Sequence, residues 1–126
     1  MAHKPKPGER GLWYFAHPYT GDEDSNFRLC NWRAAQFISL GYNIFSPISH
    51  SHPIQRAAPD LAGDIWYTLD DQIIAACAFV GIILAPGWEH SRGCRHERRL
   101  FQQRGLPILT YTEALHAWME PLQKEQ

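Results

Sequence analysis

The sequence predicts an α/β protein built as a three-layer open sheet of about four to five strands, most of them parallel. Short apolar runs typical of buried strands alternate with longer segments in which apolar residues recur at helical spacing. A strand, a helix and a second strand occupy residues 12–48, and this βαβ order makes the two strands parallel with a right-handed crossover. Together these patterns indicate a flavodoxin- or Rossmann-like arrangement.

Each expected element rests on its local sequence. Strands are expected at residues 12–16, 43–48, 79–84 and 107–110, where apolar, aromatic and β-branched residues concentrate. Helices are expected at 27–40, 64–77, 91–103 and 112–122, the last with Thr112 as its N-cap. The polar segment 49–63 is expected to be a long loop. Residues 1–11 are expected to be a flexible tail, which leaves residues 12–126 as a single domain.

Composition favours one ordinary globular domain. The 126 residues are 44% hydrophobic and 20% charged, and the net charge of −1 argues against polymeric nucleic acid or a membrane surface as a partner. Three cysteines without paired spacing do not predict a disulfide framework. The N-terminus lacks the apolar run of a signal peptide, and the longest apolar stretch, 75–85, is too short to cross a bilayer. A cytoplasmic location is therefore expected.

The less common residues gather in loops that follow the expected strands. These loops are residues 17–20, 46–52, 86–91 and 110–112. The first three contain most of the histidines, together with Tyr19 and Trp88. In open α/β sheets, ligands bind outside the carboxyl ends of the strands, near the point where the strand order reverses. The sequence therefore predicts a small-molecule site at this edge of the sheet.

The segment from residue 87 to 97 carries the most chemistry. A Gly-containing loop leads into a helix, whose first N–H groups suit phosphate or hydroxyl oxygens, so Ser91 and Gly93 are candidate ligand contacts. Glu97 lies within the first two turns, and with either Asp70 or Asp71 of the preceding helix it would form a carboxylate pair suited to a glycosidic bond. The plainer alternative is that Ser91 is only an N-cap and that Glu97, Asp70 and Asp71 lie on solvated helix faces.

Further candidates have similar alternatives. The remaining candidate ligand contacts are His17, Tyr19, Arg28, His50, His52, Trp66 and Trp88. The two tryptophans are also suited to the core, Tyr19 to local packing in a turn, and Arg28 to the surface. Loop histidines most often serve as hydrogen-bonding groups, and a spacing through His90, Cys94 and His96 is not a recognised metal-ligand pattern, so no metal is expected.

The chain contains FAHPY at 15–19, FSPISHSHP at 45–53, Trp66 with Asp70, and GWEHSRG at 87–93 followed by Glu97. These four motifs resemble those of the nucleoside 2-deoxyribosyltransferase-like superfamily, and within it a group of small bacterial and phage proteins, the DUF1937 group. The resemblance covers residues 12 to about 110. The chain departs from the pattern at Ala78, where relatives often carry an aspartate, and at residues 94–96, where they carry smaller side chains.

The resemblance implies a function. Glu97 would be the nucleophile that attacks the anomeric carbon, Asp70 would assist departure of the base, and Tyr19 would orient the nucleophile. Ser91 and Gly93 would bind the sugar or a 5′-phosphate. The expected activity is N-glycoside hydrolysis or deoxyribosyl transfer on a nucleoside or nucleoside monophosphate, without a cofactor, in a homodimer or larger homo-oligomer. The alternatives are a non-catalytic nucleotide-binding protein, acting as a sensor or by sequestration, and a protein-interaction domain.

Overall fold

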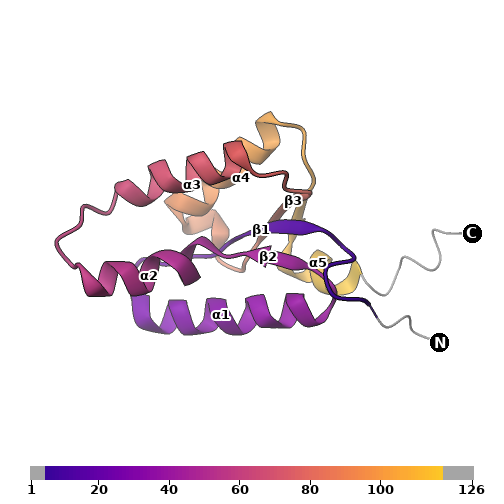
Figure 1. Cartoon of the computed structure of the whole chain (residues 1–126), viewed down its shortest axis with the longest axis horizontal. Helices are drawn as coiled ribbons and strands as arrows, with labels where there is room; N and C mark the ends of the chain where they lie inside the picture. Colours follow the sequence, from indigo (N-terminus) through magenta and orange to yellow (C-terminus); the bar gives the residue numbers. More distant parts are fainter. Residues whose placement is uncertain (1–4, 118–126) are drawn as a thin grey trace, which may run out of the picture.

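A four-stranded parallel sheet forms the middle layer of the protein (Figure 1). This is a computed structural model, and it describes residues 5–117. The strands are β1 (Leu12–Ala16), β2 (Asn43–Phe45), β3 (Gly81–Leu84) and β4 (Ile108–Thr110), in the order β2-β1-β3-β4. All three pairings are parallel, with Trp13 opposite both Ile44 of β2 and Gly81 of β3. The three-layer α/β prediction is therefore confirmed.

Helices cover both faces of the sheet, as the alternation of side chains along β1 requires. Trp13 and Phe15 enter the core under α1 (Glu23–Ser39), α2 (Pro47–Ala57) and α5 (Tyr111–Ala117). Tyr14 and Ala16 enter the core on the opposite face, under α3 (Ile65–Ala76) and α4 (Arg92–Gln103). Figure 1 shows α1 and α3 on opposite sides of the sheet. A single turn of 3₁₀ helix, η1 (Trp88–His90), connects β3 to α4.

The loop prediction for residues 49–63 is wrong over its first half, because α2 occupies Pro47–Ala57. Pro47 stands at the start of this helix, where its fixed φ suits the first turn and its missing N–H costs nothing. The same residue ends β2 early, so the strand covers Asn43–Phe45 rather than residues 43–48. The helix carries polar side chains and an internal Pro53, which hid its periodicity.

The two ends of the domain differ from expectation in detail. The N-cap of α5 is Thr110 rather than Thr112: the N–H of Glu113 donates to the Thr110 hydroxyl (3.2 Å), and the N–H of Thr110 donates to the Glu113 carboxylate (2.8 Å). The predicted end of this helix, 118–122, lies outside the described residues. In the expected tail, Arg10 donates from its backbone N–H to Gly41 (2.9 Å) and from its side chain to Leu40 (2.9 Å).

No helix among residues 5–117 has the length and apolar character needed to cross a membrane.

Candidate active site

A cavity of about 680 Å³ opens beyond the carboxyl ends of β1 and β3. These two strands are neighbours, and β2 and β4 lie on their outer sides, so the strand order reverses between them. This switch point is where open α/β sheets bind ligands. The lining residues come from the loop after β1, from α2, from α3, and from the segment leading into α4. The site predicted at this edge therefore corresponds to a real cavity.

Glu97 lies at the floor of the cavity, on the buried face of α4. Cys94, Glu97 and Phe101 are the buried residues of this helix, at a spacing that places them on one side of it. Glu97 is only 7% exposed, and it accepts a hydrogen bond from the hydroxyl of Tyr14 on β1. The helical spacing thus aims a carboxylate into the core instead of toward solvent, which excludes the alternative of a surface glutamate.

Asp70 of α3 lines the same cavity and interacts with Glu97. Burial raises the pKa of Glu97 well above its ordinary value, and the nearby charge of Asp70 raises it further, while the Tyr14 hydrogen bond opposes the rise. Burial is also the main cause that raises the pKa of Asp70, to about 6. Two carboxylates in one desolvated site cannot both ionise easily, so the pair holds a proton to higher pH than either carboxylate would alone.

Tyr14 is the tyrosine that contacts the carboxylate pair. Burial raises the pKa of its phenol well above the ordinary value, and the charge of Glu97 adds to the rise, so the hydroxyl remains a donor. Tyr19, the residue predicted for the orienting role, has its hydroxyl against His52 instead. The only sequence signal for Tyr14 was a phenol in an otherwise apolar strand, which must find a polar partner when buried.

Tyr19 is the first member of a hydrogen-bonded chain that leads away from the cavity. Its hydroxyl lies 2.6 Å from Nδ1 of His52, and Nε2 of His52 lies 2.9 Å from the Asp24 carboxylate. Because a carboxylate accepts, Nε2 carries a proton, and in the neutral ring Nδ1 accepts from Tyr19. Arg56 holds the other oxygen of Asp24 at 2.9 Å. The phenol oxygen of Tyr19 therefore keeps its lone pairs for a ligand in the cavity.

His17 forms a second fixed wall. Its Nε2 lies 2.9 Å from the Arg33 guanidinium, and its Nδ1 lies 2.8 Å from the carbonyl of Pro18. Burial lowers its pKa, and the Arg33 charge lowers it further. Since Arg33 can only donate, Nδ1 carries the single ring proton and the imidazole is neutral. Both ring nitrogens are engaged, so His17 shapes the cavity and does not act as an acid or base.

The start of α4 meets the cavity as predicted. The Ser91 hydroxyl accepts the N–H of Cys94 (3.2 Å), so Ser91 is the N-cap, and both Ser91 and Gly93 line the cavity. A Cβ added at Gly93 would meet nothing closer than the Tyr67 ring, at 3.8 Å. The missing side chain therefore leaves space beside the first N–H groups of the helix, which have no partner inside it. Burial raises the pKa of Cys94 to about 12, which excludes it as a nucleophile.

Several predicted contacts lie elsewhere. Trp88 packs against the core on the face of the sheet covered by α3 and α4, and the Arg98 guanidinium stacks over its ring, 5.3 Å from the ring centroid. Arg28 is exposed on α1, bonded to Ser25 (3.2 Å), and His50 is exposed on α2. Neither these residues nor Trp88 line the cavity, whereas Trp66 does. His52 does not line the cavity either, but it contacts Tyr19, which does. Within residues 5–117, no group of His, Cys, Asp and Glu is arranged to hold a metal ion.

The fold and the cavity define the class of protein. It is a parallel α/β protein whose ligand cavity lies at the topological switch point and contains a buried carboxylate pair contributed by two helices. The chain belongs to a family described as a domain of unknown function, DUF1937, whose profile matches residues 11–113. No curated protein matches the chain.

Proposed function

We propose that the protein cleaves the N-glycosidic bond of a nucleoside or nucleoside monophosphate, as a hydrolase or as a 2-deoxyribosyltransferase. The observation that carries this proposal is the buried pair of Glu97 and Asp70, with Tyr14 as a donor, at the floor of the cavity. Two carboxylates, one ionised and one protonated, are what a retaining glycosidic reaction requires. A relationship of the family to the nucleoside 2-deoxyribosyltransferase-like superfamily is part of the proposal.

The first step starts from the form of the pair in which the proton is on Asp70 and Glu97 is ionised, a form that the Tyr14 hydrogen bond to Glu97 favours. The bond between the anomeric carbon and the base nitrogen breaks with its electron pair on the nitrogen, which takes the proton from Asp70. A Glu97 oxygen forms the new bond to carbon. The Tyr14 hydroxyl donates a hydrogen bond to the Oε2 oxygen of Glu97 and orients the carboxylate. The product of this step is a glycosyl-enzyme ester and a free base.

In the second step water, or the nitrogen of another base, attacks the anomeric carbon. Asp70 takes the proton of the attacking group, and Glu97 leaves as a carboxylate, so the configuration is retained. Tyr19, whose lone pairs face the cavity, would accept from a sugar hydroxyl. Ser91 and Gly93 would bind the 5′ end of the sugar at the start of α4. No cofactor or metal is needed for either step.

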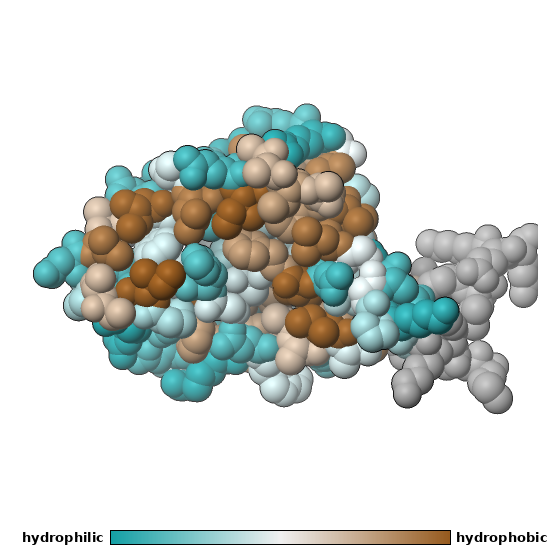
Figure 2. Space-filling view, in the orientation of Figure 1, coloured by the Kyte–Doolittle hydropathy of each residue, from teal (hydrophilic) through white to brown (hydrophobic). Residues whose placement is uncertain are grey.

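The proposal includes a homodimer or larger homo-oligomer in the cytoplasm. Figure 2 shows hydrophobic residues gathered over α3. Large apolar side chains are exposed on and beside this helix: Ile54, Leu61, Ile65 and Tyr67. Contiguous exposed apolar surface favours association with another protein surface. Sedimentation velocity of the wild-type chain would distinguish a monomer, which contradicts this part of the proposal, from a dimer or larger assembly.

A second candidate is a nucleotide-binding protein without turnover. The observation that favours it is the raised pKa of Glu97, because a protonated Glu97 is not a nucleophile. Such a protein would use the same cavity and the same residues to bind, and it would not depend on ionisation of Glu97.

The test is a chromatographic assay for free base, with purified protein and a panel of nucleosides, 2′-deoxynucleosides and their monophosphates, with and without added free bases. We expect release or exchange of base by the wild type, and a loss of at least about 10³-fold in Glu97→Gln, because the amide cannot attack. Glu89→Gln, an exposed isosteric change on η1, is the control. Tight binding of a panel member by wild type and Glu97→Gln alike, with no base released, would favour the second candidate.

A further inference from the structure

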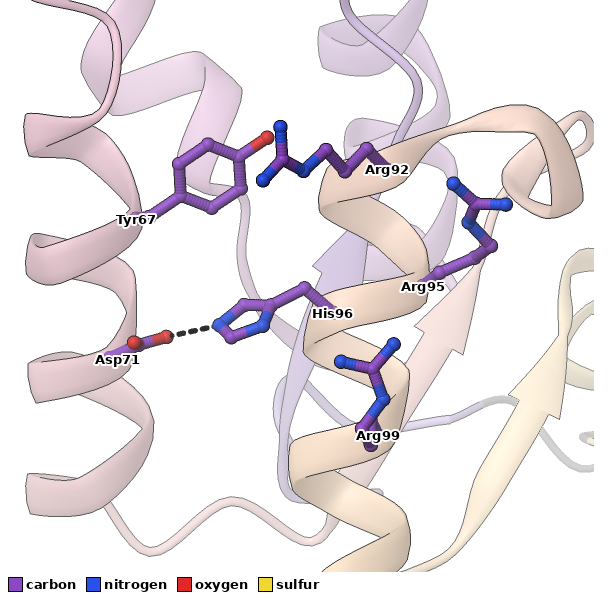
Figure 3. Close-up of a pocket in the computed structure, with 6 residues that line it drawn as sticks. All are labelled: Tyr67, Asp71, Arg92, Arg95, His96 and Arg99. Carbon is purple, nitrogen blue, oxygen red and sulfur yellow. Dashed lines mark hydrogen bonds and ion pairs between the residues drawn. The ribbon is translucent and has the colours of Figure 1, made fainter.

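A second cavity, of about 610 Å³, lies between α3 and α4 beside the candidate active site. Figure 3 shows its walls: two side chains come from α3 and four from α4. The lining residues are Tyr67, Asp71, Arg92, Arg95, His96 and Arg99. Half of them are arginines, which is unusual for a cavity in a chain whose net charge is −1.

The three arginines form one stripe along α4. Positions 92, 95 and 99 follow the i, i+3, i+7 spacing that places residues on one side of a helix. With a rise of about 1.5 Å per residue, the stripe runs for roughly 10 Å from the first turn of the helix. Like charges at this spacing repel one another, so an anion bound along the stripe would relieve an unfavourable interaction.

These three guanidinium groups have no hydrogen bond and no ion pair within residues 5–117. Each of the other arginines in the described chain contacts a partner through its guanidinium group. Five form hydrogen bonds: Arg10 to Leu40, Arg28 to Ser25, Arg33 to His17, Arg56 to Asp24 and Arg104 to Ile74. Arg98 stacks over the ring of Trp88. The single carboxylate of the cavity, Asp71, is held by His96 at 2.8 Å (Figure 3). The arginine stripe is therefore left to bind something else.

The two cavities adjoin each other and share part of their lining, because Tyr67 and Arg92 line both. In Figure 3 the Arg92 guanidinium points toward the Tyr67 hydroxyl, at the boundary between them. A sugar at Ser91 and Gly93 would present its 5′ substituent at the start of α4, where the arginine stripe begins. One phosphoryl group is too small to contact both ends of a stripe of roughly 10 Å, whereas a chain of two or three phosphoryl groups follows it.

We propose that the ligand of this site is a nucleoside di- or triphosphate, whose polyphosphate chain is bound by Arg92, Arg95 and Arg99. Guanidinium groups bind phosphate through paired, charge-assisted hydrogen bonds, which makes an arginine stripe a suitable receptor for such a chain. This inference rests on the proposed function for the sugar and base, and it replaces the monophosphate by a more highly charged substrate class.

The first test measures binding of inorganic tripolyphosphate and of inorganic phosphate by calorimetry. We expect tripolyphosphate to bind more tightly than phosphate, and its dissociation constant to rise about tenfold in Arg95→Gln and in Arg99→Gln. Arg28→Gln is the matched control, because it removes the same charge from an exposed side chain on α1, outside both cavities. Tripolyphosphate binding that is absent from the wild type, or equal in all four proteins, would overturn the proposal.

The second test separates this inference from the proposed function. Nucleoside triphosphates and monophosphates are compared in binding by Glu97→Gln, which cannot turn over, and in base release by the wild type. Preferential binding of triphosphates that needs Arg95 and Arg99, without release of base, would refute the proposed reaction and support the polyphosphate ligand. Release of base from monophosphates, with a KM equal to that for triphosphates, would support the proposed reaction and overturn the polyphosphate ligand. Triphosphates that fail to displace tripolyphosphate would make the stripe a separate anion site and overturn the inference.

Discussion

Tyr14 shows how one hydroxyl sets the chemistry of the site. Its hydrogen bond is the contact that lowers the pKa of Glu97 against burial and the Asp70 charge. In Tyr14→Phe the pKa of Glu97 therefore rises further, and ionisation of the nucleophile becomes harder. We expect kcat/KM for base release to fall about 10²-fold, and the acid limb of its pH profile to move to higher pH.

The matched control for this change is Tyr42→Phe. Tyr42 is also buried, but its hydroxyl donates to the carbonyl of Ala114 (2.8 Å), far from the carboxylates on the other face of the sheet. Both variants lose one buried hydroxyl, so a general loss of stability affects both. An acid limb that shifts equally in Tyr42→Phe, or not at all in Tyr14→Phe, would remove the assigned role from Tyr14.

At the scale of elements, β1 and α4 were predictable and α2 was not. β1 is an unbroken apolar run, and α4 begins at a Ser N-cap and ends before Gly105. The residues that determine where these elements begin and end are therefore close to them in the sequence. The buried residues of α2 are Pro47, Ile48 and His52, a set that has no apolar period. This helix is fixed by contacts with α1, which are distant in sequence, and a local pattern cannot report them.

The attachment of α2 to α1 depends on His52. Its ring stacks on Phe27 of α1 at 4.3 Å between centroids, and its two nitrogens contact Tyr19 and Asp24. We expect His52→Ala to lower the free energy of unfolding by about 1–3 kcal/mol, because it leaves a cavity and removes two hydrogen bonds. His50→Ala, exposed on the same helix, should change it by no more than about 0.5 kcal/mol. Urea denaturation measures both, and equal effects would contradict this role.

At the scale of the whole molecule, the sequence could place the site but not complete it. The carboxyl edge of a parallel sheet gathers Ser91, Gly93 and Tyr19 whatever the details of packing. The partnership of Tyr14 with Glu97 joins residues 83 positions apart, and it depends on the register of β1 against α4. The packing of the half-buried Trp88 against the core has the same origin, because an aromatic side chain is suited to a ligand or to packing equally well until its neighbours are known.

The carboxylate pair also sets how the stability of the molecule varies with pH. The folded protein raises the pKa of Asp70 to about 6 and raises that of Glu97 well above its ordinary value. A group whose folded pKa is raised contributes stability that is fully present below its unfolded pKa and is lost as pH rises through the folded pKa. The contribution of the pair is therefore complete only below the unfolded pKa of Asp70, 3.8; it declines as pH rises to about 6, and declines further as Glu97 ionises.

Glu97→Gln should remove the part of this loss that belongs to Glu97. The amide resembles the protonated acid, so the variant and the wild type should have similar melting temperatures near pH 4. At pH 8 we expect the variant to be more stable by about 1–2 kcal/mol, seen as a melting temperature higher by about 4–8 °C. Glu89→Gln, an exposed isosteric change, should show no difference that grows with pH. A Glu97→Gln variant less stable than the wild type at pH 8 would mean that the ionised carboxylate stabilises the fold, contrary to its burial.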